Sequence, residues 1–230
     1  MDEIFKEHGI ALSAESLSKL EQYTKLLISG NEKMNLTAIT EPDEIIIKHY
    51  LDSLMLLKFE DIGGKSLIDI GTGAGIPGLI LKIAETTIYA TLMDSLNKRV
   101  KFLDETIQAL ELKNVKAVHS RAEDGAKDPK LREGFDYATS RAVSRLNILC
   151  EYALPYVKIG GIFAAYKGAE IENELAEAGK AIAILGGEIE RVEKFAIKDQ
   201  SRAIIFVRKL RASPPAYPRK SNVIAKRPII

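Results

Sequence analysis

The chain has 230 residues, and its content of 46% hydrophobic and 28% charged residues is typical of a globular protein with a sizeable core. The single cysteine excludes an internal disulfide and a cysteine-rich metal site, and no apolar run reaches the roughly 18 residues of a membrane span. The N-terminal stretch MDEIFKEHGI is acidic and lacks the pattern of a secretory signal, so we expect a cytoplasmic protein.

Charge is distributed unevenly along the chain, although the net charge is only +1. No acidic residue follows Asp199. The basic residues of this last stretch are Arg202, Arg208, Lys209, Arg211, Arg219, Lys220, Lys226 and Arg227. A basic tail on an acidic body indicates either a polyanionic partner or a solvated end that aids solubility, and charge alone does not separate the two.

Two helices are predicted at the start of the chain. Apolar residues at helical spacing indicate a helix over residues 13–29, with Gly30 as its stop. Thr40 is the expected N-cap of a second helix, which runs to about Leu57. The segment DIGGKS then forms a linker. We therefore expect an N-terminal helical segment at residues 1–62.

Short apolar runs alternate with helical stretches from Ser66 onward. This alternation is the signature of a mostly parallel, doubly wound α/β sheet. The last two predicted strands, GEIERVEKFAI and SRAIIFVRK, are separated by only a few residues, so they should form an antiparallel hairpin at one edge. We expect a Rossmann-like α/β domain at residues 63–210 and a basic tail at residues 211–230.

The segment LIDIGTGAGIPG carries four glycines after a buried strand, and it fits two ligands. Gly73, Gly75 and Gly78 match the GxGxxG pattern of dinucleotide-binding proteins. Gly71, Gly73 and Gly75, with Asp69 two positions earlier, match the first motif of S-adenosylmethionine (AdoMet) methyltransferases. In both cases glycine lets ligand atoms pass close over the backbone. A dinucleotide brings a pyrophosphate, whereas AdoMet brings a sulfonium, an amino acid and an adenosine.

Two acidic residues bear on this choice. Asp69 places a carboxylate at the strand end, which suits the ammonium or sulfonium of AdoMet and does not suit a pyrophosphate. Asp94 ends the next strand and could accept both ribose hydroxyls of either ligand, so it discriminates poorly. The chain is also short for a dehydrogenase with a separate substrate domain. AdoMet is favoured, and the alternatives are a small NAD(P)-dependent oxidoreductase and a non-catalytic RNA-binding protein.

The segments NLTAI, HYLDSL, LIDIGTGAGIPG, LMDSLNKRVKFL, HSRAED, ATSRAV and YKG, in this order, closely resemble the RsmG family, also called glucose-inhibited division protein B. The resemblance covers residues 34–220. It implies a class I AdoMet-dependent methyltransferase that modifies N7 of a guanine in the 530 loop of 16S ribosomal RNA. The implied partner is the RNA, the small ribosomal subunit or its assembly intermediate. We expect a monomer.

The resemblance also implies which residues surround the cofactor. They are Gly71, Gly73 and Ile76 along the glycine loop, Asp94 and Ser95 at the ribose and adenine, Ala122 and Glu123 around the adenine, and Arg141 closing the pocket. The tail departs from the family, because Asn222 and Val223 stand where a Gly-x-Pro often follows the YPRK-like segment. This departure concerns the conformation of the tail and leaves its charge unchanged.

No general base is expected for this reaction. Guanine N7 carries an in-plane lone pair and no proton, so it can attack a sulfonium methyl directly. Methylation of cytosine C5 would need a cysteine nucleophile, and the only cysteine, Cys150, lies in an apolar helical stretch and is interpreted as core. Catalysis would rest on positioning the methyl donor and the acceptor in line. The carboxylates of Asp69 and Glu123 would help by stabilising the positive charge that moves from sulfur to guanine.

Four basic residues are predicted to contact RNA, namely Arg145, Lys167, Arg219 and Lys220. Arginine is the usual reader of the N7 and O6 edge of guanine, and Arg141 is the other candidate for that role. For both Arg141 and Arg145, a salt bridge that tethers a loop is the alternative. We expect the tail to bind phosphates and to leave AdoMet binding unchanged, unless the AYPRK segment packs on the domain.

His49, Asp52 and Ser53 share one face of the second predicted helix. Three polar groups on an otherwise apolar helix predict a supporting role, in which this helix packs against the glycine loop and the RNA groove. Direct catalysis by His49 is the alternative. Only three histidines occur and they are scattered, so no metal site is expected.

Overall fold

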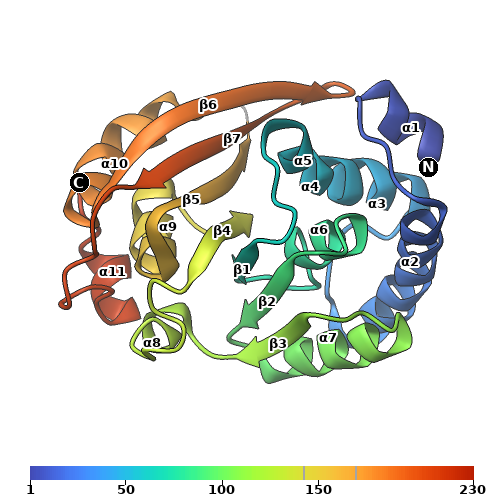
Figure 1. The fold of residues 1–230 in the computed structure, drawn as a ribbon, viewed down its shortest axis with the longest axis horizontal. Coiled ribbons are helices and arrows are strands. Elements are labelled where there is room, and N and C mark those ends of the chain that lie inside the picture. Colours follow the sequence, from blue (N-terminus) through green and yellow to red (C-terminus); the bar gives the residue numbers. More distant parts are fainter. Residues whose placement is uncertain (142, 169) are drawn as a thin grey trace.

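The computed structural model describes residues 1–141, 143–168 and 170–230. Its centre is a seven-stranded sheet in the order β3-β2-β1-β4-β5-β7-β6 (Figure 1). The strands are β1 (Ser66–Ile70), β2 (Tyr89–Asp94), β3 (Val115–His119), β4 (Phe135–Arg141), β5 (Val157–Gly168), β6 (Gly187–Ile197) and β7 (Gln200–Lys209). Strands β1 to β5 are parallel, whereas β7 runs antiparallel to both β5 and β6. The predicted parallel sheet and its antiparallel edge hairpin are confirmed.

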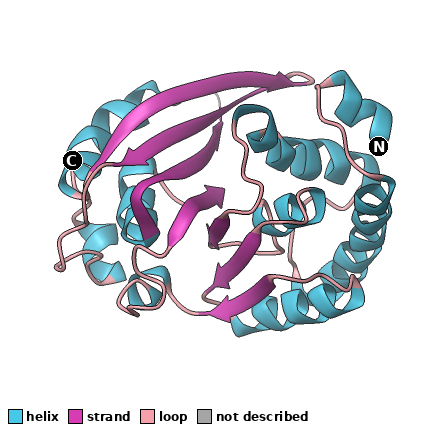
Figure 2. Cartoon of the chain, in the orientation of Figure 1, coloured by secondary structure: helices cyan, strands magenta, loops and turns pink. Residues whose placement is uncertain are grey.

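Helices cover both faces of the sheet (Figures 1 and 2). The longer ones are α2 (Ala14–Met34), α6 (Gly78–Ala84), α7 (Asn97–Ala109), α9 (Leu146–Ala153) and α10 (Glu172–Ile184). The shorter ones are α1 (Asp2–Glu7), α3 (Pro42–Ile45), the π-helical turn η1 (Ile46–Leu51), α4 (Asp52–Leu54), α5 (Leu56–Phe59), α8 (Ala122–Gly125), the 3₁₀ turn η2 (Leu154–Tyr156) and α11 (Ser221–Lys226). None of the described helices is long and apolar enough to cross a membrane.

Two hydrophobic clusters lie on opposite faces of the sheet, as the side-chain alternation of β1 shows. Leu67 belongs to the cluster that contains the N-terminal helices, α6 and α7, whereas Ile68 belongs to the cluster that contains α9 and α10. Both side chains are fully buried. Strands covered on both sides read as nearly continuous apolar runs, which explains the SLIDI sequence of β1.

The strand order reverses direction between β1 and β4, because the chain moves from β1 outward through β2 and β3 and then returns to β4. In open α/β sheets, ligands bind outside the carboxyl ends of the strands at such a reversal. Register pairing aligns β1 with β2 and with β4, so the chain leaves all three strands at one edge of the sheet.

The first long helix differs from its prediction at its C-terminus. Ser13 is the N-cap, and its hydroxyl accepts the amide of Ser16 at 3.0 Å. The predicted stop at Gly30 is wrong, because the helix continues to Met34. Gly30 instead allows α2 to approach α7 closely, since a Cβ there would lie 2.7 Å from the ring of Phe102.

The second helical region is also corrected in its start and in its regularity. Glu41 is the N-cap rather than Thr40, and Pro42 occupies the first helical position. The chain then runs to Phe59 through four short pieces instead of one helix to Leu57. The π-helical turn among them carries His49, and such turns occur frequently at functional sites.

The N-terminal helices are joined directly to the glycine loop. The fully buried hydroxyl of Tyr23 on α2 donates to the backbone oxygen of Ala74 in that loop at 2.5 Å. Thr24 and Tyr50 share a second buried hydrogen bond of 2.8 Å, which ties α2 to the π-helical turn. The position of the glycine loop therefore depends on contacts with residues about 50 positions earlier in the chain.

Candidate active site

The glycine loop connects β1 to α6, and two carboxylates hold its backbone in place by accepting hydrogen bonds from its amides. Asp94 at the end of β2 accepts the amide of Gly73 at 2.9 Å, and Asp69 on β1 accepts the amide of Gly78 at 2.9 Å. The second oxygen of Asp69 accepts the hydroxyl of Thr139 at 2.9 Å. Asp69 is fully buried, and this burial raises the pKa of its carboxyl. The structure thus places Asp69 beneath the loop, where it orders the backbone.

The glycines of this loop serve different purposes. A Cβ at Gly75 would lie 2.7 Å from Leu79, and one at Gly78 would lie 2.6 Å from Asp69, so both positions are needed for packing. A Cβ at Gly71 would lie 2.8 Å from Val143. Gly73 has φ +61, and a Cβ there would meet no atom within 4 Å. Gly73 is therefore the position at which the loop presents bare backbone to open space.

A cavity of about 160 Å³ opens beside this loop at the carboxyl ends of β1 and β2. We call it the glycine-loop cavity. Its lining includes the predicted residues Gly71, Asp94, Ser95, Ala122 and Glu123. Five of the eight predicted cofactor residues are thus brought together around one space.

The other three predicted cofactor residues lie elsewhere. Gly73 is in the loop beside the cavity without being part of its lining. Ile76 is only 8% exposed and belongs to the hydrophobic cluster under the N-terminal helices. Arg141 lines a second cavity.

The glycine-loop cavity is rich in hydrogen-bond acceptors. The carboxylate of Asp94 is 3% exposed and also accepts the amide of Leu96 at 2.9 Å. Glu123 is 6% exposed and lines the same cavity. Carboxylate oxygens accept hydrogen bonds, so a ligand that donates them would pair with these side chains. The cavity therefore suits a ligand with hydroxyl, amino or cationic groups.

Seven further residues of this lining were not predicted as cofactor residues, and Arg121, Tyr152 and Ser221 are among them. Arg121 lies within the SRAE motif, so its neighbours were a usable signal. Tyr152 follows an apolar stretch on α9 and has no motif around it. Ser221 begins α11 in the basic tail, and only the folded chain brings it to the cavity.

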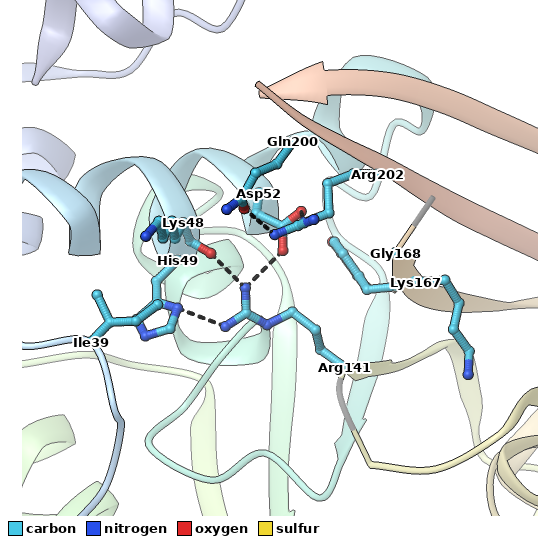
Figure 3. A pocket seen from close by; sticks show the side chains of 10 residues that line it. Ile39, Lys48, His49, Asp52, Arg141, Lys167, Gly168, Gln200 and Arg202 are labelled. Carbon is cyan, nitrogen blue, oxygen red and sulfur yellow. Dashed lines mark hydrogen bonds and ion pairs between the residues drawn. The ribbon is translucent and has the colours of Figure 1, made fainter. Parts of the chain in front are cut away.

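The second cavity, of about 450 Å³, lies between η1, the ends of β4 and β5, and the start of β7 (Figure 3). We call it the Arg141 cavity. One guanidinium nitrogen of Arg141 donates to the backbone oxygen of Lys48 at 2.8 Å and to Asp52 at 2.7 Å. The other donates to His49 Nδ1 at 2.7 Å. Arg141 thus connects the carboxyl end of β4 to the π-helical turn through His49 and Asp52.

Ser53 supports the same region through the backbone. It is fully buried, and its hydroxyl donates to the backbone oxygen of His49 at 2.6 Å. The hydroxyl of Tyr166 on β5 donates to the backbone oxygen of Ser53 at 2.8 Å. These bonds fix α4 against the sheet.

His49 is held as a neutral imidazole. Because Nδ1 accepts from an arginine, Nε2 carries the proton and donates to Thr37 Oγ1 at 2.8 Å. Burial and the nearby charge of Arg141 lower the pKa of His49 to about 4. Both ring nitrogens are engaged by protein groups, so His49 is not poised to accept a proton from a substrate.

We predict that His49 makes folding sensitive to acid. The unfolded chain takes up a proton near pH 6.5, whereas the folded chain takes it up only near pH 4. The free energy of unfolding should therefore fall as the pH drops from about 6.5 to about 4, by up to roughly 3 kcal/mol from this group. Urea unfolding at several pH values measures it. His49→Asn should flatten the fall, whereas the exposed His119→Asn should not. Equal slopes for both variants would contradict the prediction.

Three of the four residues predicted to contact RNA form ion pairs within the chain. Arg145 pairs with Glu177 at 2.5 Å, and Lys167 pairs with Glu174 at 2.6 Å. Figure 3 shows the side chain of Lys167 pointing away from Arg141. The tail also packs on the domain, which was the stated alternative. The Arg219 guanidinium pairs with Glu151 at 2.6 Å.

Lys220 is exposed and has no ion pair among the described residues. The described residues also contain no group of three or more His, Cys, Asp or Glu side chains that could hold a metal ion.

Comparison with known proteins identifies the family. The GidB family model, described as rRNA small subunit methyltransferase G, matches residues 16–205. Ribosomal RNA small subunit methyltransferase G of Desulfitobacterium hafniense is 49% identical over 224 residues, covering 96% of this chain and 93% of that protein. The protein of the same name from Clostridium beijerinckii is 48% identical and covers 100% of this chain and 97% of its own length.

Solved structures agree on the fold. A SAM-dependent methyltransferase from Aquifex aeolicus superposes with a TM-score of 0.56 at 19% identity, covering 78% of this chain and 97% of that one. TYW2 of M. jannaschii, solved in complex with AdoMet, gives a TM-score of 0.56 at 13% identity, covering 70% and 76%. These structures show the fold, and the family match supports an AdoMet-dependent methyltransferase and gives no support to the oxidoreductase alternative. The chain belongs to the GidB family of rRNA small subunit methyltransferases G.

Proposed function

We propose that this methyltransferase transfers the methyl group of AdoMet to N7 of a guanine in the 530 loop of 16S ribosomal RNA. The observation that supports the proposal is the position of two cavities on either side of the carboxyl end of β4. Gly71 and Val143 line the glycine-loop cavity, and Arg141 lines the other. Arg141 and Val143 would thus lie between the methyl donor and the RNA base.

The residues of the glycine-loop cavity fit AdoMet. Asp94 and Glu123 provide carboxylate acceptors for the ribose hydroxyls and the adenine amino group. Gly73 leaves the open space that a side chain would fill. When bound, AdoMet supplies an electrophilic methyl group on a cationic sulfur. The carboxylate of Glu123 also favours a cationic ligand over a pyrophosphate.

The residues of the Arg141 cavity fit an acceptor that needs no deprotonation. Guanine N7 carries no proton, and His49 has both ring nitrogens occupied by Arg141 and Thr37. The role left to this chain is to position the base, exclude water and neutralise phosphate charge. Arg202 and Lys48 in the cavity lining supply cationic groups for that purpose, and each also pairs with a carboxylate of the chain, Asp52 at 3.9 Å and Glu44 at 2.6 Å.

The partner would be the small ribosomal subunit, its assembly intermediate or the RNA itself, which places the reaction in the cytoplasm. We propose that the chain acts as a monomer. The exposed side chains of Lys220, Lys226 and Arg227 add cations at the two ends of α11 and carry no ion pair among the residues described. Such cations bind phosphates by releasing counterions, so RNA affinity should fall as salt rises.

The test is methyl transfer from labelled AdoMet to 16S RNA and to small subunits from cells that lack this gene. We expect label in 7-methylguanosine of the 530 loop, and the faster of the two substrates identifies the physiological one. Label in another base or another loop would overturn the assignment of the target, and no label in any RNA would overturn the activity.

Asp94→Ala should weaken AdoMet binding by at least about tenfold, because a hydrogen bond to a charged group contributes roughly 1.5–3 kcal/mol. The same change removes the acceptor for the Gly73 amide, which adds to the loss. Calorimetric titration with AdoMet measures the effect. Asp104→Ala on the exposed face of α7 serves as the matched control. Normal affinity in folded Asp94→Ala would remove Asp94 from the cofactor site.

A further inference from the structure

We infer that the C-terminal segment, residues 212–230, forms one wall of the cofactor pocket, and that Glu151 and Arg219 are positioning residues that hold this wall in place. The inference rests on the proposed binding of AdoMet in the glycine-loop cavity. It replaces the expectation from sequence that the tail serves RNA alone.

The segment is anchored by a bidentate ion pair between Arg219 and the buried carboxylate of Glu151. Arg219 Nε donates to one carboxylate oxygen of Glu151 at 2.8 Å, and its terminal nitrogen donates to the other at 2.6 Å. The backbone amide of Arg219 donates to the first oxygen as well, at 2.8 Å. Glu151 is 1% exposed, so this carboxylate depends on the tail for its hydrogen bonds. A planar guanidinium suits such a paired contact, and a lysine could not reproduce it fully.

A second set of contacts fixes the backbone of the segment. Arg132, which precedes β4, donates to the backbone oxygens of Ser213 at 2.8 Å and Tyr217 at 2.9 Å. Ile224 on α11 is fully buried, and Asn147 on α9 donates to the backbone oxygen of Ile229 at 3.2 Å. The segment is therefore a folded part of the domain rather than a free basic arm.

On α9 and on the C-terminal segment alike, the residue that forms the ion pair is close in sequence to a residue that lines the cavity. On α9, Glu151 binds Arg219 while the next residue, Tyr152, lines the glycine-loop cavity. On the tail, Arg219 stands two positions before Ser221, which lines the same cavity. Figure 1 shows α11 beside α8 and α9. Release of the Glu151–Arg219 pair would thus withdraw Ser221 from the wall that faces Asp94 and Glu123.

The segment presents different chemistry on its two sides. Ser221 faces the cavity with a small hydroxyl that can bond a nucleoside, whereas Lys220, Lys226 and Arg227 are exposed to solvent. One element therefore contributes to the cofactor site and offers cations for RNA phosphates. Truncation of the tail would impair both ligands, and only point variants can separate the two contributions.

The experiment measures AdoMet affinity, in the absence of RNA, for Arg219→Ala and Arg219→Lys in the full chain. We expect Arg219→Ala to weaken AdoMet at least about fivefold and Arg219→Lys to recover part of the loss. In turnover with saturating RNA, KM for AdoMet should rise while kcat at saturating AdoMet stays within twofold. Wild-type affinity in folded Arg219→Ala, or a fall in kcat with unchanged KM, would overturn the inference.

A second pair of variants covers the case in which Arg219→Ala fails to fold. Ser221→Trp should fill the cavity from the tail side and weaken AdoMet at least tenfold, whereas Asn222→Trp, at the exposed next position, should bind normally. Equal affinity for these two variants would overturn the inference. Asp94→Ala distinguishes a failure of the inference about the tail from a failure of the proposed cofactor site. If Asp94→Ala loses affinity while the tail variants do not, only the tail assignment fails. If none loses affinity, AdoMet binds elsewhere.

Discussion

Gly73→Val is expected to abolish AdoMet binding while the protein remains folded. Gly73 has φ +61, which costs an L-residue about 1–2 kcal/mol, and a β-branched residue is least suited to it. The added methyl groups would project into open space beside the glycine-loop cavity, where no protein atom lies within 4 Å. Affinity should fall on the order of 100-fold or more, equivalent to about 2.7 kcal/mol. Calorimetric titration with AdoMet measures it.

Gly64→Val is the matched control for this variant. Gly64 has φ +67, and a Cβ there also meets nothing within 4 Å, but it lies in the turn before β1 at the opposite end of that strand. Both variants should therefore lose similar stability, and only Gly73→Val should lose AdoMet. Normal AdoMet binding by Gly73→Val would show that the ligand does not pass over this loop.

Arg141→Ala is expected to destabilise the protein by about 3–5 kcal/mol and to eliminate methyl transfer. The variant leaves Asp52, which is 4% exposed, without its 2.7 Å partner, and it leaves His49 Nδ1 without a donor. Removing one member of a buried ion pair is costly because the remaining charge stays desolvated. Arg141→Lys should recover little, since an ammonium cannot reach all three acceptors in the same plane. Urea unfolding measures the change.

Arg145→Ala provides the comparison, because this arginine lies only four residues further along the chain. Its ion pair with Glu177 is exposed, with 57% of the arginine side chain accessible. An exposed pair contributes about 0–1 kcal/mol, so stability should hardly change. If both alanine variants lowered the free energy of unfolding equally, the Arg141 network would stabilise the fold no more than an exposed ion pair does.

Much of the sheet was predictable because its determinants are local. Apolar runs, helical periodicity and a short connection before the last strand defined the order of elements and the antiparallel hairpin. The errors occurred where tertiary contacts overrode local signals. Gly30 reads as a helix stop, yet it sits inside α2 because Phe102 packs against it. The π-helical turn at His49 has no sequence periodicity of its own, and it is stabilised by Arg141 from a distant strand.

The candidate site divides in the same way. Residues close to the motifs, such as Gly71, Asp94 and Glu123, line one cavity. The roles of Arg219 and Ser221 depend on a return of the chain to α9, about 70 residues away, and no spacing rule predicts that return. Charge led to the expectation of a free RNA-binding tail, because a count of basic residues does not reveal which of them a buried carboxylate occupies.

The antiparallel hairpin has a consequence for self-association. Strand β6 is a free edge of the sheet and is 11 residues long, a length that could template pairing with another chain. Its charged residues are Glu188, Glu190, Arg191, Glu193 and Lys194. The register shifts between Ile189 and Arg191, which breaks the regular ladder in the middle of the edge. A second sheet that docked there would have to desolvate these charges and match an irregular backbone, so the edge resists aggregation through β-pairing even at high protein concentration.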